Sequence, residues 1–367
     1  MPASKLPRVR SRPGALLYVD VRDAIHDAIR GGVFPVGTRL PSTKDLAASL
    51  GVSLVTTHRA MQALEARGVI DRVQGRGTFV TERKDRPLRR LAVVLQPQAS
   101  LADYYHGDLL DGMNRAAREL GADLLIRHAV EPTRRVSSAA DGTSPEKPWG
   151  GTDAFLLLNP LPAAADAFRV TLADGVPSLL VGAHAEGLPH VDVDNVDLIR
   201  QAVDHLLSLG HRRILYVGGA ECLSNSRDRR DAFIGACADA GIDGGRRLEA
   251  KSWRLSEEEK EEAVGRLRSP DPPTAAIGAG YYLTLDVYEA AGAAGLEVPA
   301  DLSVVGVGDP MSAPHLSPPL TTMRQPLVDL GRAAVERVSS MLDGQDAGSV
   351  DLKAELIVRA STGRASP

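Results

Sequence analysis

The sequence has little cysteine and no long apolar run. Among its 367 residues, cysteine occurs only at Cys222 and Cys237, which lack CxxC spacing. They indicate neither a disulfide framework nor a zinc site, and are typical of reduced thiols in a cytoplasmic protein. No run reaches the eighteen apolar residues of a membrane-spanning helix, although 43% of the residues are hydrophobic, so we expect a globular chain of two or three domains.

Signals for export, metal binding and hydrolysis are also missing. The basic first residues, MPASKLPRVRSRPG, are followed by no apolar segment of signal-peptide length, so we expect a protein that is not exported. The histidines of the second part show no metal-binding spacing, and no nucleophile elbow occurs. We therefore expect no metal and no bound cofactor.

The charge is distributed unevenly along the chain. Residues 1–90 hold 17 Lys+Arg against 8 Asp+Glu, whereas the remaining residues hold 26 against 39, and the net charge is -4. A basic segment joined to an acidic body is a hint of a nucleic-acid-binding module. A solvated basic face without a partner is the alternative that charge alone leaves open.

The basic segment contains three stretches with helical spacing. Residues 18–30 form the first; in the second, Ser42 is the expected N-cap and Asp45 follows three residues later, resembling a capping box. Ser53 is the expected N-cap of a third helix. The predicted buried face of that helix holds Thr57, Ala60, Met61 and Leu64. Two helices joined by a short glycine-containing turn predict a helix-turn-helix, whose second helix enters the DNA major groove.

The stretch RVQGRGTFV, residues 72–80, predicts a hairpin directly after these helices. Alternating residues on both sides of Gly75, Arg76 and Gly77 are typical of paired strands joined by a tight turn. An arginine at such a tip can enter the negative potential of a narrow minor groove. Hairpin and helices together predict a winged helix.

Residues 16–80 resemble the winged helix-turn-helix of the GntR family of bacterial regulators, through the phrases PVGTRLPS and GRGTFV. The resemblance implies that Arg39 grips DNA at the foot of the second helix, that the start of the third helix reads bases, and that the wing contributes Arg76. The residues assigned to the DNA interface are Arg39, Ser42, Thr43, Ser53, Leu54, Thr56, His58, Arg59, Gly75, Arg76 and Gly77.

The third helix, which is the predicted recognition helix, departs from the family pattern. Leu54 stands where arginine is frequent, and His58 replaces another frequent arginine. An apolar side chain at 54 can pack on a thymine methyl group, while Arg59 and Thr56 can reach phosphates or base edges. The operator bases usual for the family therefore do not transfer to this chain.

From residue 91 the pattern changes to short apolar runs alternating with helical stretches, which predicts parallel sheets covered by helices on both faces. Residues 81–90 predict a solvated linker, with a phosphate-contacting tail as the alternative, and residues 131–151 a surface insertion. The predicted strands are 91–97, 154–160, 178–183, 213–219, 275–280 and 302–308, and the predicted helices 108–120, 163–173, 198–209, 229–240 and 283–292.

Residues 90–345 resemble the effector domain of the LacI/GalR regulators through LSLGHRRILYVGG, VPADLSVVGVGD, PPLTTMRQP and VDVDN. The resemblance implies a periplasmic-binding-protein-like body that dimerises and senses a sugar, nucleobase or similar metabolite. It also implies three chain crossings between subdomains, near 191–195, 318–323 and 348–355. A GntR-type reader joined to such a sensor is similar to arabinose-repressor-type regulators.

The expected fold is thus an α+β winged helix-turn-helix domain followed by an α/β body of two doubly wound subdomains with parallel sheets. The expected parts are a basic tail (1–15), the DNA-binding domain (16–82), a linker (83–90), the effector-binding and dimerisation domain (91–362) and a C-terminal tail (363–367).

The ligand cleft departs most from the LacI/GalR pattern. Arg229 matches the arginine that binds ligand hydroxyls, with an ordinary surface arginine as the alternative. Hydrogen-bonding side chains of the family are replaced by Gly182, by Gly280 in a Gly-Tyr pair, and by Gly308, which leaves Asp309.

Three glycines in the cleft are expected to widen it and to expose backbone N–H groups. In this interpretation four tyrosines form walls on which a ligand ring stacks; the alternative is that they are half-buried packing residues. They are Tyr104, Tyr105, Tyr281 and Tyr282. The resulting hypothesis is an effector larger than a monosaccharide, or a ring-bearing non-sugar.

The sequence therefore predicts a cytoplasmic, homodimeric, ligand-responsive transcriptional regulator, with repression favoured over activation and no membrane partner. Its partners are operator DNA and a small metabolite that shifts the population of cleft states. A regulator with a pyridoxal-phosphate enzyme-like body is the rival, but none of the second part's lysines ends a predicted strand. They are Lys147, Lys251, Lys260 and Lys353. A transport binding protein is the third alternative. It would carry an export signal and would lack a DNA-binding domain.

Overall fold

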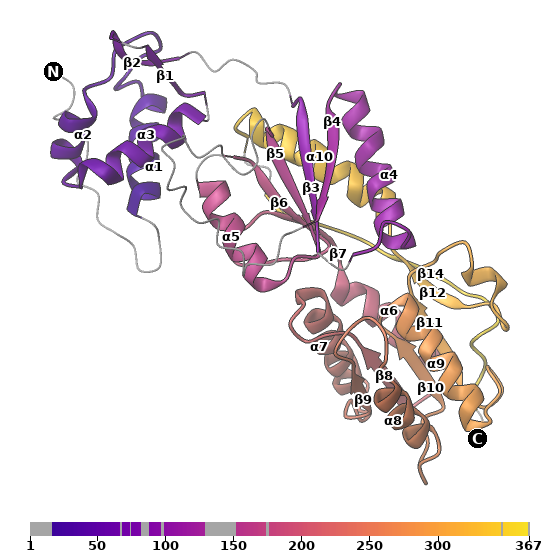
Figure 1. The fold of residues 1–367 in the computed structure, drawn as a ribbon. Helices are drawn as coiled ribbons and strands as arrows, with labels where there is room; N and C mark the ends of the chain where they lie inside the picture. The colour runs from indigo at the N-terminus through magenta and orange to yellow at the C-terminus, as the bar shows by residue number, and fades with distance from the viewer. Residues whose placement is uncertain are drawn as a thin grey trace.

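The computed structural model describes residues 17–66, 68–73, 75–81, 88–96, 99–128, 152–173, 176–345 and 348–365. A small N-terminal unit, indigo in Figure 1, is followed by two α/β lobes. Within these ranges no helix is long and apolar enough to cross a membrane. The predicted tail at 1–15 and the predicted insertion at 131–151 lie outside the described residues.

The N-terminal unit is the predicted winged helix-turn-helix. Its elements are α1 (Leu17–Arg30), α2 (Thr43–Leu50), α3 (Leu54–Ala66), β1 (Ile70–Val73) and β2 (Gly77–Val80). The three helices enclose a small apolar core. The fully buried members of that core include Val21, Ile25, Phe34, Leu46, Leu50, Met61 and Leu64.

Short polar side chains begin the second and third helices. The Ser42 hydroxyl accepts the Asp45 N–H at 3.2 Å, and the Ser53 hydroxyl accepts the Thr56 N–H at 3.0 Å. The capping box predicted at Ser42 is only half present, because Asp45 Oδ2 accepts a hydrogen bond from the Ser42 hydroxyl at 2.6 Å instead of one from the cap backbone. Aspartate is one methylene shorter than the glutamate that usually makes the return bond.

The wing contains a third extended segment that the sequence did not predict. β1 and β2 pair antiparallel, with Ile70 opposite Val80. Residues 38–40 lie along the other edge of β2, where Leu40 N donates to Thr78 O at 2.8 Å and Val80 N donates to Thr38 O at 2.9 Å. The wing is therefore anchored to the segment that precedes α2.

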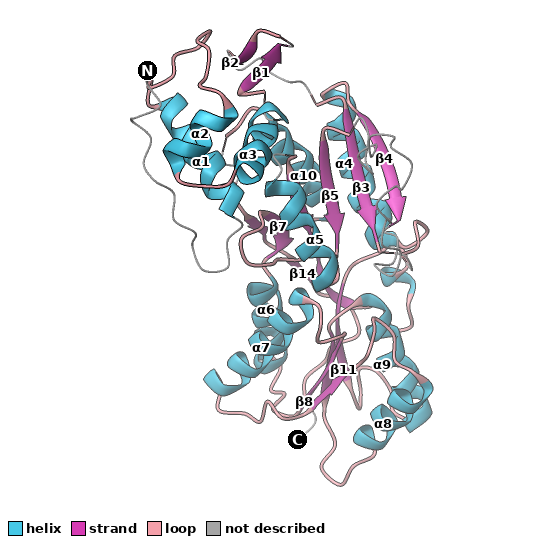
Figure 2. Ribbon diagram, turned by 60° about the vertical axis from the view of Figure 1, so that its left-hand side comes forward, coloured by secondary structure: helices cyan, strands magenta, loops and turns pink. Residues whose placement is uncertain are grey.

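The first lobe is a parallel six-stranded sheet of order β13-β7-β6-β5-β3-β4. Helices α4 (Tyr104–Glu119) and α10 (Leu327–Leu342) pack on one face, and α5 (Pro162–Ala173) packs on the other (Figures 1 and 2). The strands are β3 (Arg90–Leu95), β4 (Asp123–His128), β5 (Ala154–Leu158), β6 (Ser178–Val181), β7 (His190–Val193) and β13 (Val350–Leu352).

The second lobe has the sheet order β14-β12-β11-β10-β8-β9, with β14 antiparallel to β12 and the other pairs parallel. One face is covered by α6 (Asn195–Ser208) and α7 (Ser224–Asp239), the other by α8 (Glu257–Leu267) and α9 (Tyr281–Ala294). The remaining elements are β8 (Ile214–Gly218), β9 (Arg247–Glu249), β10 (Ala275–Gly278), β11 (Ser303–Val307), β12 (Thr321–Arg324), β14 (Glu355–Ile357) and the 3-10 turn η2 (Ala313–His315). The two lobes confirm the predicted fold class.

The chain passes between the lobes three times. It leaves the first lobe after β7, returns between β12 and α10, and leaves again between β13 and β14. The predicted second crossing at 318–323 is wrong by a few residues, because β12 still belongs to the second sheet and the chain crosses at Gln325 and Pro326.

Several predicted boundaries are also corrected. The helices predicted from residues 108, 198 and 229 begin earlier, at Tyr104, Asn195 and Ser224, because their first residues carry no apolar periodicity. Of the predicted linker, residues 82–87 lie outside the described ranges. Leu88 is 3% exposed in the core of the first lobe, so the linker ends before it.

Candidate DNA interface and effector cleft

The two faces of α3 differ as the sequence predicts. Thr57, Ala60, Met61 and Leu64 are fully buried against α1 and α2. Leu54, His58 and Arg59 are exposed on the remaining surface, and Thr56 is half-buried. The face that a major groove would meet is therefore free of the domain core.

Not every side chain on that face is available to DNA in the same way. The Arg59 guanidinium lies over the ring of Tyr18 in α1, 4.2 Å from the ring centroid. The Ser53 hydroxyl lies 2.7 Å from the Thr56 hydroxyl. The predicted contacts of Arg59 and Thr56 with DNA would therefore replace interactions that the folded domain already makes.

Two predicted DNA-binding arginines lie on the wing. The backbone of Arg39 pairs with that of Phe79 in an antiparallel β-bridge. The Arg39 guanidinium covers Gly77, where a Cβ would lie 2.5 Å from Arg39 Nε. Gly77 also has φ +114, so a side chain there would be strained for two reasons. Arg76 is exposed at the tip, and its N–H donates to Val73 O at 2.9 Å to close the turn. Gly75, with φ +75, completes the turn.

The remaining predicted DNA-binding residues, Ser42 and Thr43, start α2. Ser42 is exposed and Thr43 is half-buried. Both lie four residues or fewer from Arg39, which places the start of α2 and the wing close together along the chain. The structure thus gathers two arginines, two capped helix starts and the outward face of α3 in one domain.

In the body, Arg229 occupies a buried position between the lobes. It is 4% exposed and lies in the amino-terminal half of α7. Its Nε donates to Asn195 Oδ1 at 2.7 Å, one terminal nitrogen donates to Ala279 O at 2.7 Å, and the other to Gln325 Oε1 at 3.4 Å. Arg229 therefore joins the start of α6, the end of β10 and the second interlobe crossing, and is not an ordinary surface arginine.

The prediction that the cleft glycines widen the cleft is wrong, because neighbouring side chains occupy the freed space. A Cβ on Gly182 would overlap the Tyr105 hydroxyl, and a Cβ on Gly308 would overlap the Tyr104 hydroxyl. A Cβ on Gly280 would lie 3.0 Å from the Trp253 ring. Aromatic side chains thus occupy the space beside these three glycines.

The tyrosines predicted as stacking walls make contacts within the protein. Tyr104 packs edge-on against Tyr281 across the cleft, with ring centroids 5.5 Å apart, and Tyr281 in turn lies edge-on to Tyr282. The Tyr281 hydroxyl is 2.7 Å from Ser312 Oγ, and the Tyr105 hydroxyl is 3.4 Å from the Asn159 side chain. Burial raises the pKa of Tyr104 and of Tyr105 far above the ordinary value, so both phenols are neutral hydrogen-bonding groups.

Asp309 is committed to ion pairs. Its Oδ2 accepts from Arg324 at 2.7 and 2.9 Å, and its Oδ1 lies 2.7 Å from an Arg359 nitrogen. Burial raises the pKa of the Asp309 carboxyl, but the hydrogen bonds from Arg359 and Arg324 outweigh burial and hold the pKa below its ordinary value. An effector would have to compete with two arginines for this carboxylate.

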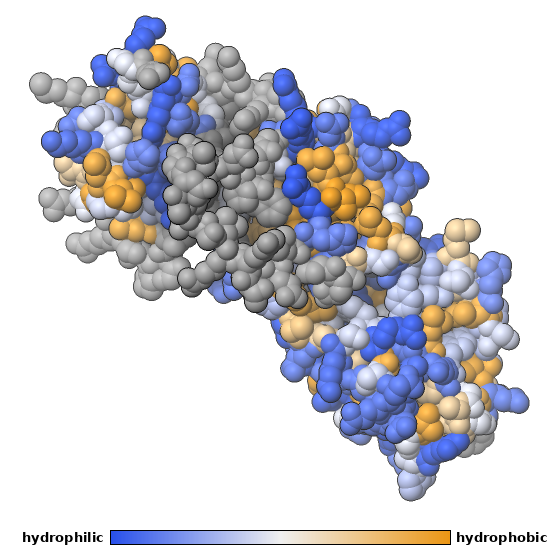
Figure 3. Space-filling model, viewed as in Figure 1, coloured by the Kyte–Doolittle hydropathy of each residue, from blue (hydrophilic) through white to orange (hydrophobic). Residues whose placement is uncertain are grey.

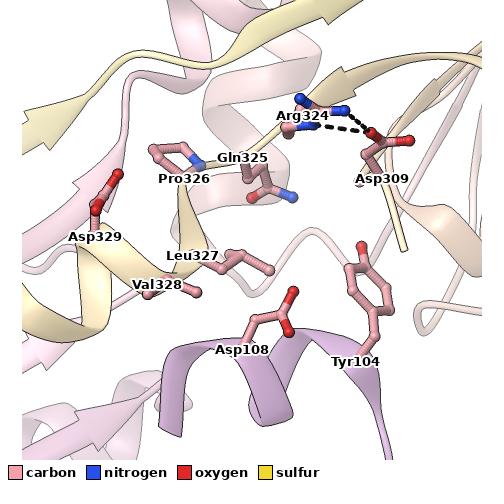
Figure 4. Close-up of a pocket in the computed structure, with 10 residues that line it drawn as sticks. Tyr104, Asp108, Asp309, Arg324, Gln325, Pro326, Leu327, Val328 and Asp329 are labelled. Carbon is pink, nitrogen blue, oxygen red and sulfur yellow. Dashed lines mark hydrogen bonds and ion pairs between the residues drawn. The ribbon is translucent and has the colours of Figure 1, made fainter. Parts of the chain in front are cut away.

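Asp309 also lines a pocket of about 250 Å³ at the edge of the cleft. In Figure 4 the Tyr104 hydroxyl and the Asp108 carboxylate rise from α4 towards Gln325, which leads from β12 into α10. The other lining residues are Gly308, Arg324, Pro326, Leu327, Val328 and Asp329. The pocket therefore lies between the start of α4, the end of β11 and the second crossing.

Sequence reasoning missed two residues of the cleft. Trp253 lies on the loop after β9, with its ring against the backbones of Gly219 and Gly280 and its centroid 5.7 Å from the Arg229 guanidinium. No periodic pattern marks that loop. Asn225 is buried at the start of α7 and donates to Gly182 O at 2.9 Å across the cleft.

The buried Asp192 was also missed, although it stands in the quoted phrase VDVDN. It is 3% exposed, its Oδ1 accepts the Val193 N–H at 2.7 Å, and its Oδ2 accepts from Asn195 at 3.2 Å. Burial raises the pKa of Asp192 to about 7, against the opposing hydrogen bond from Val193 and the charge of Arg229. A carboxyl that titrates near neutrality thus lies at the first crossing.

A winged helix joined to a bilobed body with a ligand-type cleft defines a class: the protein is a ligand-responsive, DNA-binding transcriptional regulator. Comparisons with known proteins agree in both parts. Residues 17–80 match the family described as bacterial regulatory proteins, gntR family, and residues 203–362 match the periplasmic binding protein-like domain.

Known relatives extend the match over nearly the whole chain. The HTH-type transcriptional regulator AglR of Rhizobium meliloti (strain 1021) is 30% identical over 345 residues, which cover 88% of this chain and 94% of AglR. The arabinose metabolism transcriptional repressor of Geobacillus stearothermophilus is 25% identical and covers 94% of this chain and 97% of its own. A LacI transcriptional regulator from a Rhodococcus species has a solved structure that is 31% identical, with a TM-score of 0.61, covering 76% of this chain and 99% of that one.

The chain belongs to the family of LacI-type transcriptional regulators, and its DNA-binding domain belongs to the gntR family. The family assignment agrees with the resemblances noted in the sequence.

Proposed function

We propose that the chain is a dimeric repressor that binds operator DNA through α3 and the wing, and whose operator affinity changes when a small metabolite binds between the lobes. Two similar proteins support the direction of control. The Geobacillus stearothermophilus relative is a repressor by name, as is the transcriptional repressor CytR of Escherichia coli (strain K12), which is 27% identical and covers 86% of this chain and 90% of its own.

The observation that carries the proposal is the position of Arg229. One side chain binds the start of α6, the end of β10 and Gln325 in the second crossing. The bond to Gln325, at 3.4 Å, is the longest of the three. A ligand that takes a hydrogen bond from Arg229 would release Gln325 and so change the geometry of the hinge between the lobes.

The cleft favours a sugar-sized ring with hydroxyl groups. The Trp253 ring offers an aromatic face beside Arg229, a combination that suits a flat or pyranose-like ring. Within the described residues, the buried Asn225 Oδ1 and Ser226 Oγ have no hydrogen-bond partner, and ligand hydroxyls would satisfy both. Because the space beside the cleft glycines is filled, we propose a ligand no larger than a simple carbohydrate; the repressor of arabinose metabolism among the relatives points to the same class.

Selection of genomic fragments retained by the full-length protein tests the DNA part of the proposal. Fragments should share one inverted repeat, and anisotropy titrations of that operator should give a steep decrease of affinity with salt. Retention of no fragment above background would refute the regulator function for this chain.

The ligand part can be tested through tryptophan fluorescence. The chain has only two tryptophans, so Trp149→Phe leaves Trp253 as the single reporter. Titration with a panel of pentoses, hexoses and nucleosides should give one compound that changes Trp253 emission and lowers operator affinity in parallel. A compound that dissociates the operator without affecting Trp253 would place the effector elsewhere.

We propose that the dimer forms through the body. Figure 3 shows apolar atoms gathered on the first lobe around β3 and β4, and β4 is the edge strand of its sheet. Leu120 is 45% exposed and Ile126 is 42% exposed in this region. An exposed apolar sheet edge is a common dimerisation surface, and sedimentation at micromolar concentration should give twice the chain mass.

Regulation is proposed in preference to pyridoxal-phosphate chemistry. Of the described lysines in the body, Lys251 and Lys353 are exposed, and Lys260 forms ion pairs with Glu257 and Glu289 on the surface of α8 and α9. A Schiff-base lysine needs an enclosed site that lowers its pKa. The purified protein should therefore show no absorbance near the visible edge.

A further inference from the structure

The start of α3 presents two adjacent apolar side chains to solvent. Val55 is 79% exposed and Leu54 is 55% exposed, whereas Met61 and Leu64, further along the same helix, are fully buried. Val55 points directly away from the domain core, since it is roughly half a helical turn from the buried stripe. Both residues thus leave most of their surface exposed to solvent.

The polar groups around this pair are already engaged. The Ser53 hydroxyl caps the helix and lies 2.7 Å from the Thr56 hydroxyl. Arg59, one turn after Val55, has its guanidinium over the Tyr18 ring. The most protruding groups at the start of the helix are therefore two branched aliphatic side chains.

We infer that Leu54 and Val55 form an apolar reading surface for the 5-methyl groups of thymines in the operator major groove. The inference rests on the proposed function, because it takes α3 as the helix that enters the groove. Thymine is the one base that presents an apolar group there, and aliphatic side chains contact it. The wing places Arg39 and Arg76 on the same domain, so phosphate contacts would hold the helix in the groove while the apolar pair selects the base.

The test removes single methyl groups from DNA without changing base pairing. An operator is first selected from random fragments with the full-length protein, and each thymine is then replaced by deoxyuridine. At one or two thymines in each half-site the substitution should weaken binding about fourfold, the effect of exposing one methyl group. Thymines outside the α3 footprint should tolerate the change.

Matched variants assign the effect to the two residues. Val55→Ala and Leu54→Ala should weaken binding to the thymine operator and abolish the difference between thymine and uracil at the affected position. Val36→Ala serves as the control, because Val36 is also an exposed valine, at 58%, but lies on the loop before Arg39. It should keep the full thymine preference.

The possible results separate the inference from the function. Failure to select any operator would overturn both. An operator that binds tightly and is indifferent to uracil at every thymine would overturn the inference alone. A Val55→Ala, Leu54→Ala double variant that keeps the thymine preference but loses self-association would also overturn it, and would assign the pair to a contact between copies of the chain.

Discussion

The hydroxyl of Tyr104, at the start of α4 in the first lobe, occupies the space that a side chain at Gly308 would fill at the end of β11 in the second lobe. Gly308 has φ +100, so its backbone also disfavours any other residue. The ring of Tyr104 also packs edge-on against the ring of Tyr281, with the ring centroids 5.5 Å apart. Gly308, which replaces a polar residue of the family pattern, thus leaves space that Tyr104 from the opposite lobe fills.

The contact between Tyr104 and Gly308 predicts that even a methyl group at position 308 destabilises the body. Gly308→Ala should lower the free energy of unfolding of the body by about 1–3 kcal/mol, because the new Cβ displaces Tyr104 and strains the backbone. Small-angle scattering should show a larger radius of gyration, because the lobes are held apart. Urea unfolding measures the first effect.

A double-mutant cycle separates crowding from backbone strain. Tyr104→Phe removes the overlapping hydroxyl, so adding it to Gly308→Ala should recover at least about 0.5 kcal/mol. Gly292→Ala, in the open on α9, is the control and should be neutral or slightly stabilising. Strict additivity of the Tyr104 and Gly308 effects would show that the two residues do not meet.

The parts of the fold that follow from local pattern could be predicted from the sequence. The buried stripe of α3 and the Gly-Arg-Gly turn are local signals, because helical spacing and positive φ depend on neighbouring residues. Residues 38–40 pair with β2 only once the wing has folded, so no local pattern marks that third segment. The predicted helices also omitted α10 although its apolar residues have helical spacing; its partner α4 is more than two hundred residues away.

The cleft was less predictable than the fold. Family phrases indicated Arg229, but its partner Gln325 comes from a crossing whose position was predicted too early. The space beside each glycine depends on side chains from distant segments. Trp253, which fills the space at Gly280, lies on a loop without periodicity. A glycine in place of a polar residue can therefore mean either an open pocket or an aromatic neighbour, and only the three-dimensional structure distinguishes them.

The tip of the wing should contribute electrostatically to operator binding. Arg76 is exposed and closes the turn through its backbone, so Arg76→Ala should leave thermal stability unchanged. It should weaken operator binding and reduce the slope of log affinity against log salt by about 1, since one phosphate contact is lost. Arg115→Ala, which removes an exposed arginine of α4 in the body, should change neither quantity. An unaltered slope in Arg76→Ala would exclude a phosphate contact by the wing.

Arg229 should couple the effector to the hinge without contributing to DNA binding. Arg229→Lys keeps the charge but cannot bind Asn195, Ala279 and Gln325 together, so the effector response should fall at least tenfold while operator affinity stays within twofold. Arg230→Lys is the matched control, because the adjacent Arg230 pairs with Glu221 and Asp231 on the surface. Loss of operator binding together with a lowered melting temperature in Arg229→Lys would indicate misfolding, and a normal effector response would remove Arg229 from the site.

The buried carboxyl of Asp192 should make stability depend on pH below neutrality. Burial raises its pKa to about 7 in the folded protein, whereas an unfolded aspartate has a pKa of about 4. Between these values the folded state binds more protons than the unfolded state, so this residue makes the protein less stable as pH rises, by up to ~1.4 kcal/mol per pH unit. Asp192→Asn cannot ionise, so its free energy of unfolding, measured with urea from pH 4.5 to 7.5, should lack this component. Wild-type and variant curves that run parallel over that range would show that Asp192 is already ionised in the folded protein, with its charge stabilised by Arg229.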